Sequence, residues 1–187
     1  SGVSGAILRL LIDKGIFLEE EHPISRLRRY SGAIGAPHPL DTQQQNAANA
    51  IRQAWQDKNV VLLHGVTSSG KTEVYIHLIE EALQKGKQVL YLVPEIALTT
   101  QLTERLQAVF GSQLVVYHSR FSNAERVEIY NEVRGERGDE QSKVILGARS
   151  AIFLPFRDLG LIIVDEEHEP SYKQQDPAPR YHARSAA

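Results

Sequence analysis

The sequence predicts an α/β protein with a mainly parallel, doubly wound sheet. Five short apolar runs occur along the chain, at residues 60–64, 88–93, 113–118, 143–147 and 161–165. These runs do not alternate apolar with polar residues, which is typical of parallel strands buried on both faces. Helical patterns separate them, most clearly at 72–85 and 122–134. Strands and helices in this alternating order fold into a sheet with helices on both faces.

Two of the predicted helices begin with the spacing of a capping box, in which two side chains bond each other's main-chain N–H groups. One box pairs Thr42 with Gln45, and the other pairs Ser122 with Glu125. Behind the first box, one face of the predicted helix is apolar. That face consists of Ala47, Ala48, Ile51, Ala54 and Trp55.

The first 39 residues have a different organisation. Residues 3–14 have the apolar spacing of a helix, Gly15 stands where a C-cap glycine belongs, and residues 16–21 have the pattern of a short strand. This pattern favours either the C-terminal part of a winged-helix-like module, over residues 1–30, or a simple linker helix. Residues 31–39 are interpreted as a linker, and residues 40–187 as one lobe.

The composition is that of an ordinary globular protein, with 42% hydrophobic and 24% charged residues among 187. No apolar run is long enough to span a membrane and no signal peptide is recognisable, so a cytoplasmic location is expected. With no cysteine, the chain has no thiolate metal site. A net charge of −2 argues against wholesale coating of nucleic acid but permits a local basic track. We interpret the chain, which contains no methionine, as a piece of a longer protein.

The segment after the first apolar run matches the phosphate-loop motif G-x-x-x-x-G-K-[ST] at every fixed position. Its glycines let successive main-chain N–H groups point into one concavity, and the following helix adds its positive N-terminal end. Lys71 can reach the β- and γ-phosphates of ATP, and Thr72 can offer its hydroxyl to Mg²⁺. The alternative is a chance match in a glycine-bearing turn. The predicted nucleotide-contacting residues here are Gly65, Val66, Thr67, Ser68, Ser69, Gly70, Lys71, Thr72 and Glu73.

A second candidate feature, an acidic one, follows the last apolar run. Asp165 and Glu166 begin the sequence DEEH directly after that run. The carboxyl edge of an open α/β sheet is where ligands bind, so Asp165 is predicted to hold Mg²⁺. Glu166 is predicted to be the base that orients the attacking water. The alternative is a solvated acidic turn without a function.

Several blocks of the sequence resemble the superfamily 2 DNA helicases, and within them the replication-restart helicases of the primosomal protein N′ family. The blocks are GVTSSGKTEVY, LVPEIALTTQL, GARSAIFLPF and DEEHEPSYKQQDPAPRYHAR, and the resemblance extends from about Leu40 to the last residue. It implies that residues 40–187 form the first RecA-like P-loop NTPase lobe of such a helicase. It also implies ATP and Mg²⁺ as cofactors, and a winged helix ahead of the lobe.

The resemblance further implies roles for residues outside the phosphate loop. Gln44 would contact adenine, Arg149 and Ser150 would contact single-stranded DNA, and His168 would couple the nucleotide to the DNA. The last part of the chain resembles an aromatic-rich loop that links DNA contact to ATP hydrolysis; its candidates are Tyr172, Lys173, Arg180 and Tyr181. From the residues alone, Gln44 could be helix surface, Arg149 could pair with a sheet-edge acid, and the loop could be a solvated tail.

The function that the resemblance implies is ATP-dependent 3′–5′ DNA unwinding that restarts stalled replication forks and initiates primosome assembly. The implied partners are forked and single-stranded DNA, primosome proteins and single-strand-binding protein, in the bacterial cytoplasm near the nucleoid and without a membrane. Zinc is expected only in another part of the full-length protein. Without a second motor lobe, this chain is expected to hydrolyse ATP very slowly and to unwind nothing. The alternatives are a nucleotide-dependent binding switch and a non-helicase NTPase.

Overall fold

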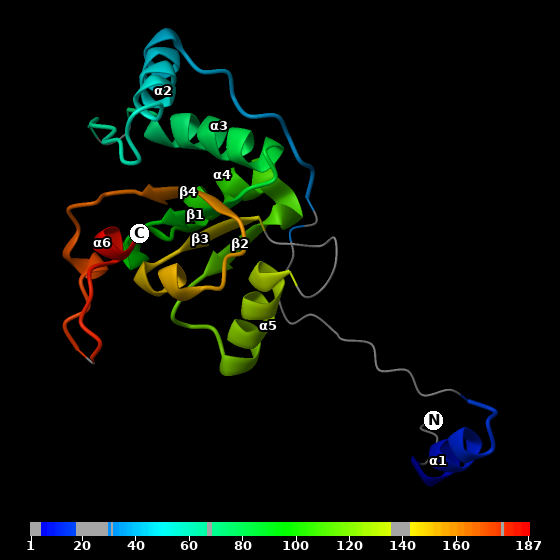
Figure 1. Cartoon of the computed structure of the whole chain (residues 1–187). Helices are drawn as coiled ribbons and strands as arrows, with labels where there is room; N and C mark the ends of the chain where they lie inside the picture. The colour runs from blue at the N-terminus through cyan, green and yellow to red at the C-terminus, as the bar shows by residue number, and fades with distance from the viewer. Residues whose placement is uncertain (1–4, 18–29, 31, 67–68, 136–142, 177) are drawn as a thin grey trace.

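The computed structural model describes residues 5–17, 30, 32–66, 69–135, 143–176 and 178–187 (Figure 1). Its centre is a parallel four-stranded sheet in the order β2-β3-β1-β4. The strands are β1 (Gln88–Leu92), β2 (Leu114–Tyr117), β3 (Val144–Gly147) and β4 (Leu159–Val164). The predicted fold class and four of the five predicted strands are therefore confirmed.

The register of the sheet brings the carboxyl ends of all four strands to one edge. Leu92 at the end of β1 lies opposite Gly147 of β3 and Val164 of β4, and Tyr117 of β2 also lies opposite Gly147. The residues that follow each strand are therefore neighbours along this edge, although they are far apart in the sequence. In open α/β sheets this is the edge where ligands bind.

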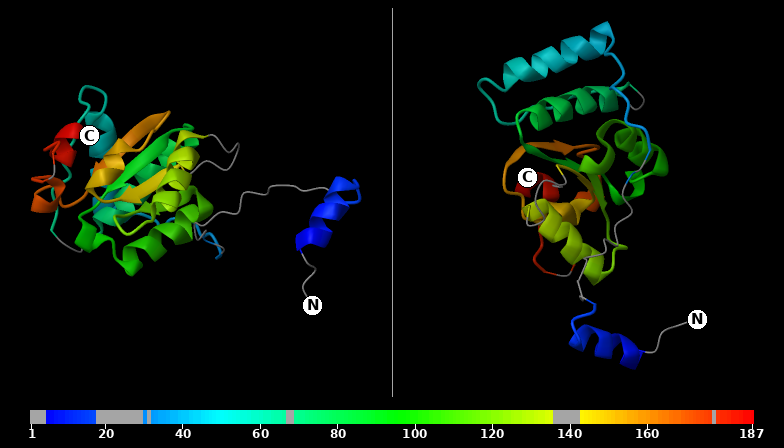
Figure 2. Two further views of the ribbon diagram at one scale, coloured as in Figure 1. Left: turned by 90° about the horizontal axis from the view of Figure 1, so that it is seen from below. Right: turned by 90° about the vertical axis from the view of Figure 1, so that its right-hand side faces the viewer.

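Helices cover both faces of the sheet (Figures 1 and 2). On one face, α3 (Lys71–Gln84) and α4 (Thr100–Phe110) enclose a core that includes Ile76, Ile79 and Leu106. On the other, the core includes Ile129 of α5 (Asn123–Arg134), Ala151 of the 3₁₀ turn η3 (Arg149–Phe153) and Ala183 of α6 (Ala183–Ala186). The shorter 3₁₀ turns are η1 (Glu95–Ala97), η2 (Gly111–Gln113) and η4 (Pro170–Tyr172). The right-hand view of Figure 2 shows α2 (Thr42–Ala54) stacked on the outside of α3.

The helix starts confirm one predicted capping box and correct the other. Ser122 and Glu125 cap α5 as predicted. At α2 the box is one residue earlier than predicted: Asp41 accepts from the Gln44 N–H at 2.8 Å, and the Gln44 side chain accepts from the Asp41 N–H at 2.9 Å. Either residue pair has the box spacing, and the carboxylate is the better acceptor for a helix N-terminus.

The predicted first strand, residues 60–64, is not a strand in the structure. Val61 and Leu63 pack against the cluster formed by α2 and α3, whereas Val60 and Leu62 are 85% and 72% exposed. The segment therefore buries alternate side chains only. Among the described residues, no strand lies beside it to supply the main-chain partners that a ladder needs.

The N-terminal predictions are only partly covered by the structure. The predicted helix is present as α1 (Gly5–Asp13), and Gly15 has the predicted left-handed conformation with φ of +67°. Residues 18–21 of the predicted strand lie outside the described residues. In the predicted linker, the Gly35 N–H donates to the Ala108 carbonyl at 2.7 Å, so this part rests on α4. No helix in the described ranges has the length and apolar character needed to cross a bilayer.

Candidate functional site

The phosphate-loop motif leads into the first turn of α3. Gly70 has φ of +75°, a conformation that favours glycine, and Lys71 is the first residue of the helix. Gly65 lies close to the other end of the loop, since a Cβ built there would be 2.9 Å from the Ser69 hydroxyl. Thr67 and Ser68, both predicted to contact phosphate, lie outside the described residues. The described part thus has the glycine-dependent turn and the helix N-terminus that the motif requires.

The side chain of Lys71 is folded over the loop. Its Nζ donates to the main-chain carbonyls of Gly65 at 2.7 Å and Val66 at 3.1 Å. The ammonium group therefore lies against the main chain at the start of the phosphate loop. An anionic phosphate would be a stronger partner for this cation than two neutral carbonyls.

Gln44, the predicted adenine contact, lies beside the phosphate loop. Its Nε2 donates to the Gly70 carbonyl at 3.3 Å, while its Oε1 closes the capping box with the Asp41 N–H. Both ends of the amide are therefore engaged by the protein. Each end keeps one further bonding direction, a second N–H on Nε2 and a second lone pair on Oε1, so the amide can contact a base while both hydrogen bonds stay in place.

Asp165 lies at the carboxyl edge of the sheet, beside the end of β1. Its N–H donates to the Leu92 carbonyl at 2.9 Å and so extends the β4 ladder by one residue. Burial raises the pKa of the Asp165 carboxyl, an effect opposed by hydrogen bonds from Tyr91 and the Glu166 N–H and by the positive charge of Lys71. Contacts connect this carboxylate to α3: the Tyr91 hydroxyl donates to Asp165 Oδ2 at 3.2 Å, and the Tyr91 ring packs edge-on against Tyr75, one helical turn after Lys71.

Glu166 occupies a strained position directly after Asp165. Its φ is +49°, and it is the only non-glycine residue with a positive φ within the part of the chain that the structure describes. This conformation is uncommon for a side-chain-bearing residue, and such outliers concentrate at functional sites. The half-exposed carboxylate lies 3.6 Å from the ring nitrogen of His168, whose side chain is 70% exposed. Both groups are open to a ligand.

The side chain of Glu73, a predicted nucleotide contact, is engaged by Arg105. Its Oε1 accepts from Nε and Nη2 of Arg105 at 3.0 and 2.5 Å, which ties α3 to α4. The sequence analysis missed Arg105 because nothing in the spacing shows that two helices separated by a strand will place these charges together. Arg105 is the one basic residue of α4, but the sequence does not show which carboxylate it faces.

Arg149 contacts the aromatic-rich loop rather than a sheet-edge acid. Its Nη1 donates to the carbonyls of Ser171 at 3.4 Å and Lys173 at 2.9 Å, and its guanidinium carbon lies 5.8 Å from the centre of the Tyr181 ring. Tyr181 in turn contacts the Phe153 ring edge-on, with ring centres 4.8 Å apart. Phe153 is 61% exposed, and the sequence analysis missed it. The only signal in the sequence was its position shortly after Arg149 and Ser150, the predicted DNA contacts.

Tyr172 requires a correction as a residue that stacks on DNA bases. It was predicted as a DNA-contacting or coupling residue, yet it has no exposed surface, so its ring cannot stack on a base. Its hydroxyl donates to the Asp165 carbonyl at 2.6 Å. Tyr172 therefore holds the main chain at the start of the acidic turn.

The other loop candidates remain on the surface. Lys173 and Arg180 are exposed, and Tyr181 is half-buried. Lys173 forms an antiparallel bridge with His182, and the Gln174 N–H donates to the Tyr181 carbonyl at 2.8 Å. These described residues form a closed loop rather than a solvated tail.

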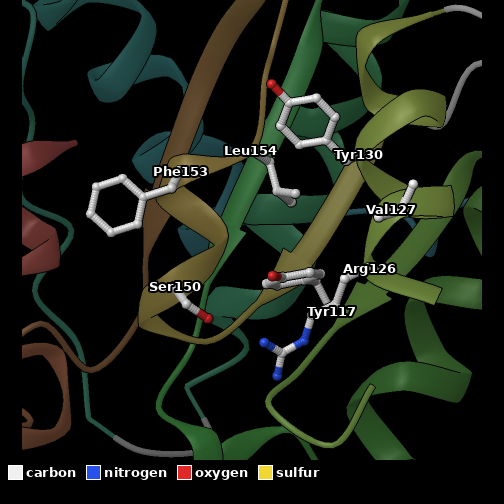
Figure 3. Close-up of a pocket in the computed structure, with 7 residues that line it drawn as sticks. All are labelled: Tyr117, Arg126, Val127, Tyr130, Ser150, Phe153 and Leu154. Atoms are coloured by element: carbon white, nitrogen blue, oxygen red, sulfur yellow. The ribbon is translucent and has the colours of Figure 1, made fainter. Parts of the chain in front are cut away.

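A pocket of about 210 Å³ lies between α5 and η3, on the β2–β3 side of the same sheet edge (Figure 3). Ser150, a predicted DNA contact, is exposed at its border. Figure 3 shows Tyr117 and Leu154 facing the space between the two elements, whereas the Phe153 ring points away from it. The pocket is separated from Asp165, because Asp165 follows β4 at the opposite end of the sheet.

The sequence is similar to known proteins over almost its whole length. The DEAD/DEAH box helicase family matches residues 41–186. Across 98% of its length, the chain is 43% identical to the replication restart protein PriA of Bacillus subtilis and 43% identical to that of Synechocystis. It is 42% identical to the PriA of Haemophilus influenzae. The aligned region covers 23%, 22% and 25% of these three relatives, so the chain spans about a quarter of their length. The resemblance seen in the sequence is thereby confirmed.

Proposed function

Because this chain belongs to the DEAD/DEAH box helicase family, a family that implies ATP binding, we propose that it is the ATP-binding lobe of a replication-restart helicase. The full-length protein would unwind DNA 3′ to 5′ at stalled forks, at the expense of ATP, and would initiate primosome assembly. The observation that carries this proposal is the contact between α3 and the acidic residues: Tyr75, one turn after Lys71, packs on Tyr91, whose hydroxyl donates to Asp165. A phosphate-binding cation and a desolvated carboxylate would then act on one triphosphate.

The proposed domain organisation follows the same relationship. Residues 40–187 would form the first motor lobe, residues 31–39 a linker, and residues 1–30 the C-terminal part of a winged-helix-like module. The contact between Gly35 and α4 indicates that the linker would be held against the lobe.

The phosphate loop and the acidic turn would have different roles in ATP hydrolysis. The Thr72 hydroxyl and the Asp165 carboxylate are oxygen donors of the kind that Mg²⁺ prefers, so these two residues would hold the ion. When bound, Mg²⁺ would neutralise developing charge on the phosphates. Lys71 would move from the loop carbonyls to the β- and γ-phosphates, and Gln44 would contact adenine. Glu166, half-exposed in its left-handed turn, would orient the attacking water.

We propose that the surface around Arg149 binds single-stranded DNA. Arg149, Ser150, Tyr181 and Phe153 lie together on the η3 turn and the aromatic-rich loop. Aromatic rings stack on bases without sequence preference, and cations bind the phosphates. Lys173 and Arg180 would add charge, and His168 would connect this surface to Glu166.

Further partners and cofactors are proposed from the relationship to PriA alone. They are primosome proteins and single-strand-binding protein in the bacterial cytoplasm near the nucleoid, and zinc in another region of the full-length protein.

The alternative function is a nucleotide-dependent binding switch or another NTPase. A pure switch does not need a water-orienting carboxylate, so the strained conformation of Glu166 favours hydrolysis. DNA-independent turnover would favour a non-helicase NTPase.

The proposal can be tested with ATP binding and DNA-stimulated ATP turnover. In the full-length protein, Lys71→Ala and Asp165→Asn should each reduce turnover at least about 100-fold, because each removes a charge that the phosphates or their metal require. Lys85→Ala, an exposed lysine just after the end of α3, is the matched control and should have no effect. Full DNA-stimulated turnover by Lys71→Ala would refute the proposal.

A further inference from the structure

Two buried phenols reach Asp165 from different elements. Tyr91 lies in β1, and Tyr172 ends the η4 turn that follows the acidic residues. Neither ring has any exposed surface. The two side chains come from positions 81 residues apart, so their meeting at one aspartate is a product of the fold.

Tyr91 contacts the carboxylate itself. Its hydroxyl lies 3.2 Å from Asp165 Oδ2, while the Glu166 N–H lies 3.1 Å from Oδ1. Each carboxylate oxygen therefore has one protein donor. With two remaining lone-pair directions on an acceptor-only group, the carboxylate can still bind a cation. Its plane, however, is fixed by these two contacts.

Tyr172 holds the main chain of the same residue. Its hydroxyl donates to the Asp165 carbonyl at 2.6 Å, a short and well-formed hydrogen bond. Tyr172 is itself restrained, since Arg149 donates to the carbonyls on either side of it, those of Ser171 and Lys173. The turn that carries Glu166 thus begins at a residue fixed both at its side chain and at its main chain.

Both phenols are permanent donors. A tyrosine hydroxyl keeps its proton at neutral pH, because the ordinary tyrosine pKa is about 10. A buried hydroxyl without a partner costs free energy, so a core that needed only aromatic packing would be served by phenylalanine at both positions.

We propose that Tyr91 and Tyr172 are positioning residues that preset Asp165 for the divalent cation of the bound nucleotide. This inference rests on the proposed function, in which Asp165 is the metal ligand. Partners of a metal ligand commonly change metal affinity 10- to 100-fold when they are removed, because they fix the orientation of the ligand. The effect should therefore appear in the Mg²⁺ dependence of nucleotide binding and not in nucleotide binding as such.

Tyr91→Phe and Tyr172→Phe remove one hydroxyl each and keep the ring. In the full-length protein, the affinity for a fluorescent ATP analogue is measured with excess EDTA and then across a Mg²⁺ titration. Each variant should need about tenfold more Mg²⁺ for half of the Mg²⁺-dependent gain in affinity. The affinity in EDTA should stay within about twofold of wild type. Tyr75→Phe is the matched control, since the Tyr75 ring packs edge-on against Tyr91, at 5.6 Å, and should keep the wild-type Mg²⁺ dependence.

The outcomes separate this inference from the function on which it rests. An unchanged Mg²⁺ midpoint in both phenylalanine variants would show that the phenols only fill the core, and the inference would be wrong. An equal loss of affinity in EDTA would also overturn it, because that loss would reflect general damage to the site. Asp165→Asn tests the premise: if its Mg²⁺ midpoint were that of wild type, both the metal role of Asp165 and the positioning role of the phenols would fail.

Discussion

The contact between Gln44 and the phosphate loop can be tested through Gly70. Gly70 has φ of +75°, and a Cβ at this position would lie 2.3 Å from Nε2 of Gln44. Gly70→Ala therefore has two costs. A left-handed conformation costs an ordinary residue about 1–2 kcal/mol. Displacing Gln44 breaks its hydrogen bond to the Gly70 carbonyl and disturbs the α2 capping box, at about 1 kcal/mol more.

The expected loss in the free energy of unfolding is therefore about 2–3 kcal/mol, or about 5–10 °C in Tm for a chain of this length. Gly86→Ala is the matched control. Gly86 follows α3, has a similar φ of +73°, and has open space where the Cβ would lie. It should lose only the conformational part. Urea unfolding of both variants, followed by circular dichroism, isolates the contribution of Gln44.

A double-mutant cycle sharpens the test. In a Gln44→Ala background, Gly70→Ala should cost no more than Gly86→Ala does in the wild type, because the amide that obstructs the new methyl group is gone. Equal costs for the two glycine variants in the wild-type background would refute the described packing of Gln44 on the loop.

Three other predictions follow from particular contacts. Glu166→Gln in the full-length protein should bind ATP with unchanged affinity but hydrolyse it at least about 100-fold more slowly in a single-turnover assay, because the amide cannot accept a proton. Arg149→Lys should lose the contacts to the Ser171 and Lys173 carbonyls, and limited proteolysis should then cut the loop at 173–182 several-fold faster. Hydrogen bonds from Ser122 hold the pKa of Glu125 below its usual value near 4.5. The stability that these hydrogen bonds contribute is present above the usual pKa of Glu125 and is lost as the pH falls through its lower folded-state pKa. In Ser122→Ala, the free energy of unfolding, measured by urea unfolding at a series of acidic pH values, should therefore fall less steeply as the pH is lowered.

Much of the fold could be predicted from local patterns. The strands at 88–93, 113–118, 143–147 and 161–165 and the helices at 72–85 and 122–134 have lengths and periodicities that depend only on neighbouring residues. The exception, 60–64, has the composition of a buried strand but not its neighbours. Burial on both faces requires partners along the sheet, and composition alone does not supply them.

The sequence by itself determined the fold class, the phosphate loop and the acidic residues after β4, because each depends on residue types at short, fixed spacing. The tertiary structure alone decided how these side chains are engaged: Gln44 on Gly70, Glu73 on Arg105, and Tyr172 beneath Asp165. These contacts join residues from 7 to 32 positions apart across different elements. Whether a polar side chain faces a ligand or a neighbour depends on which groups the packed elements bring within hydrogen-bonding distance, and the packing of the whole lobe sets that distance.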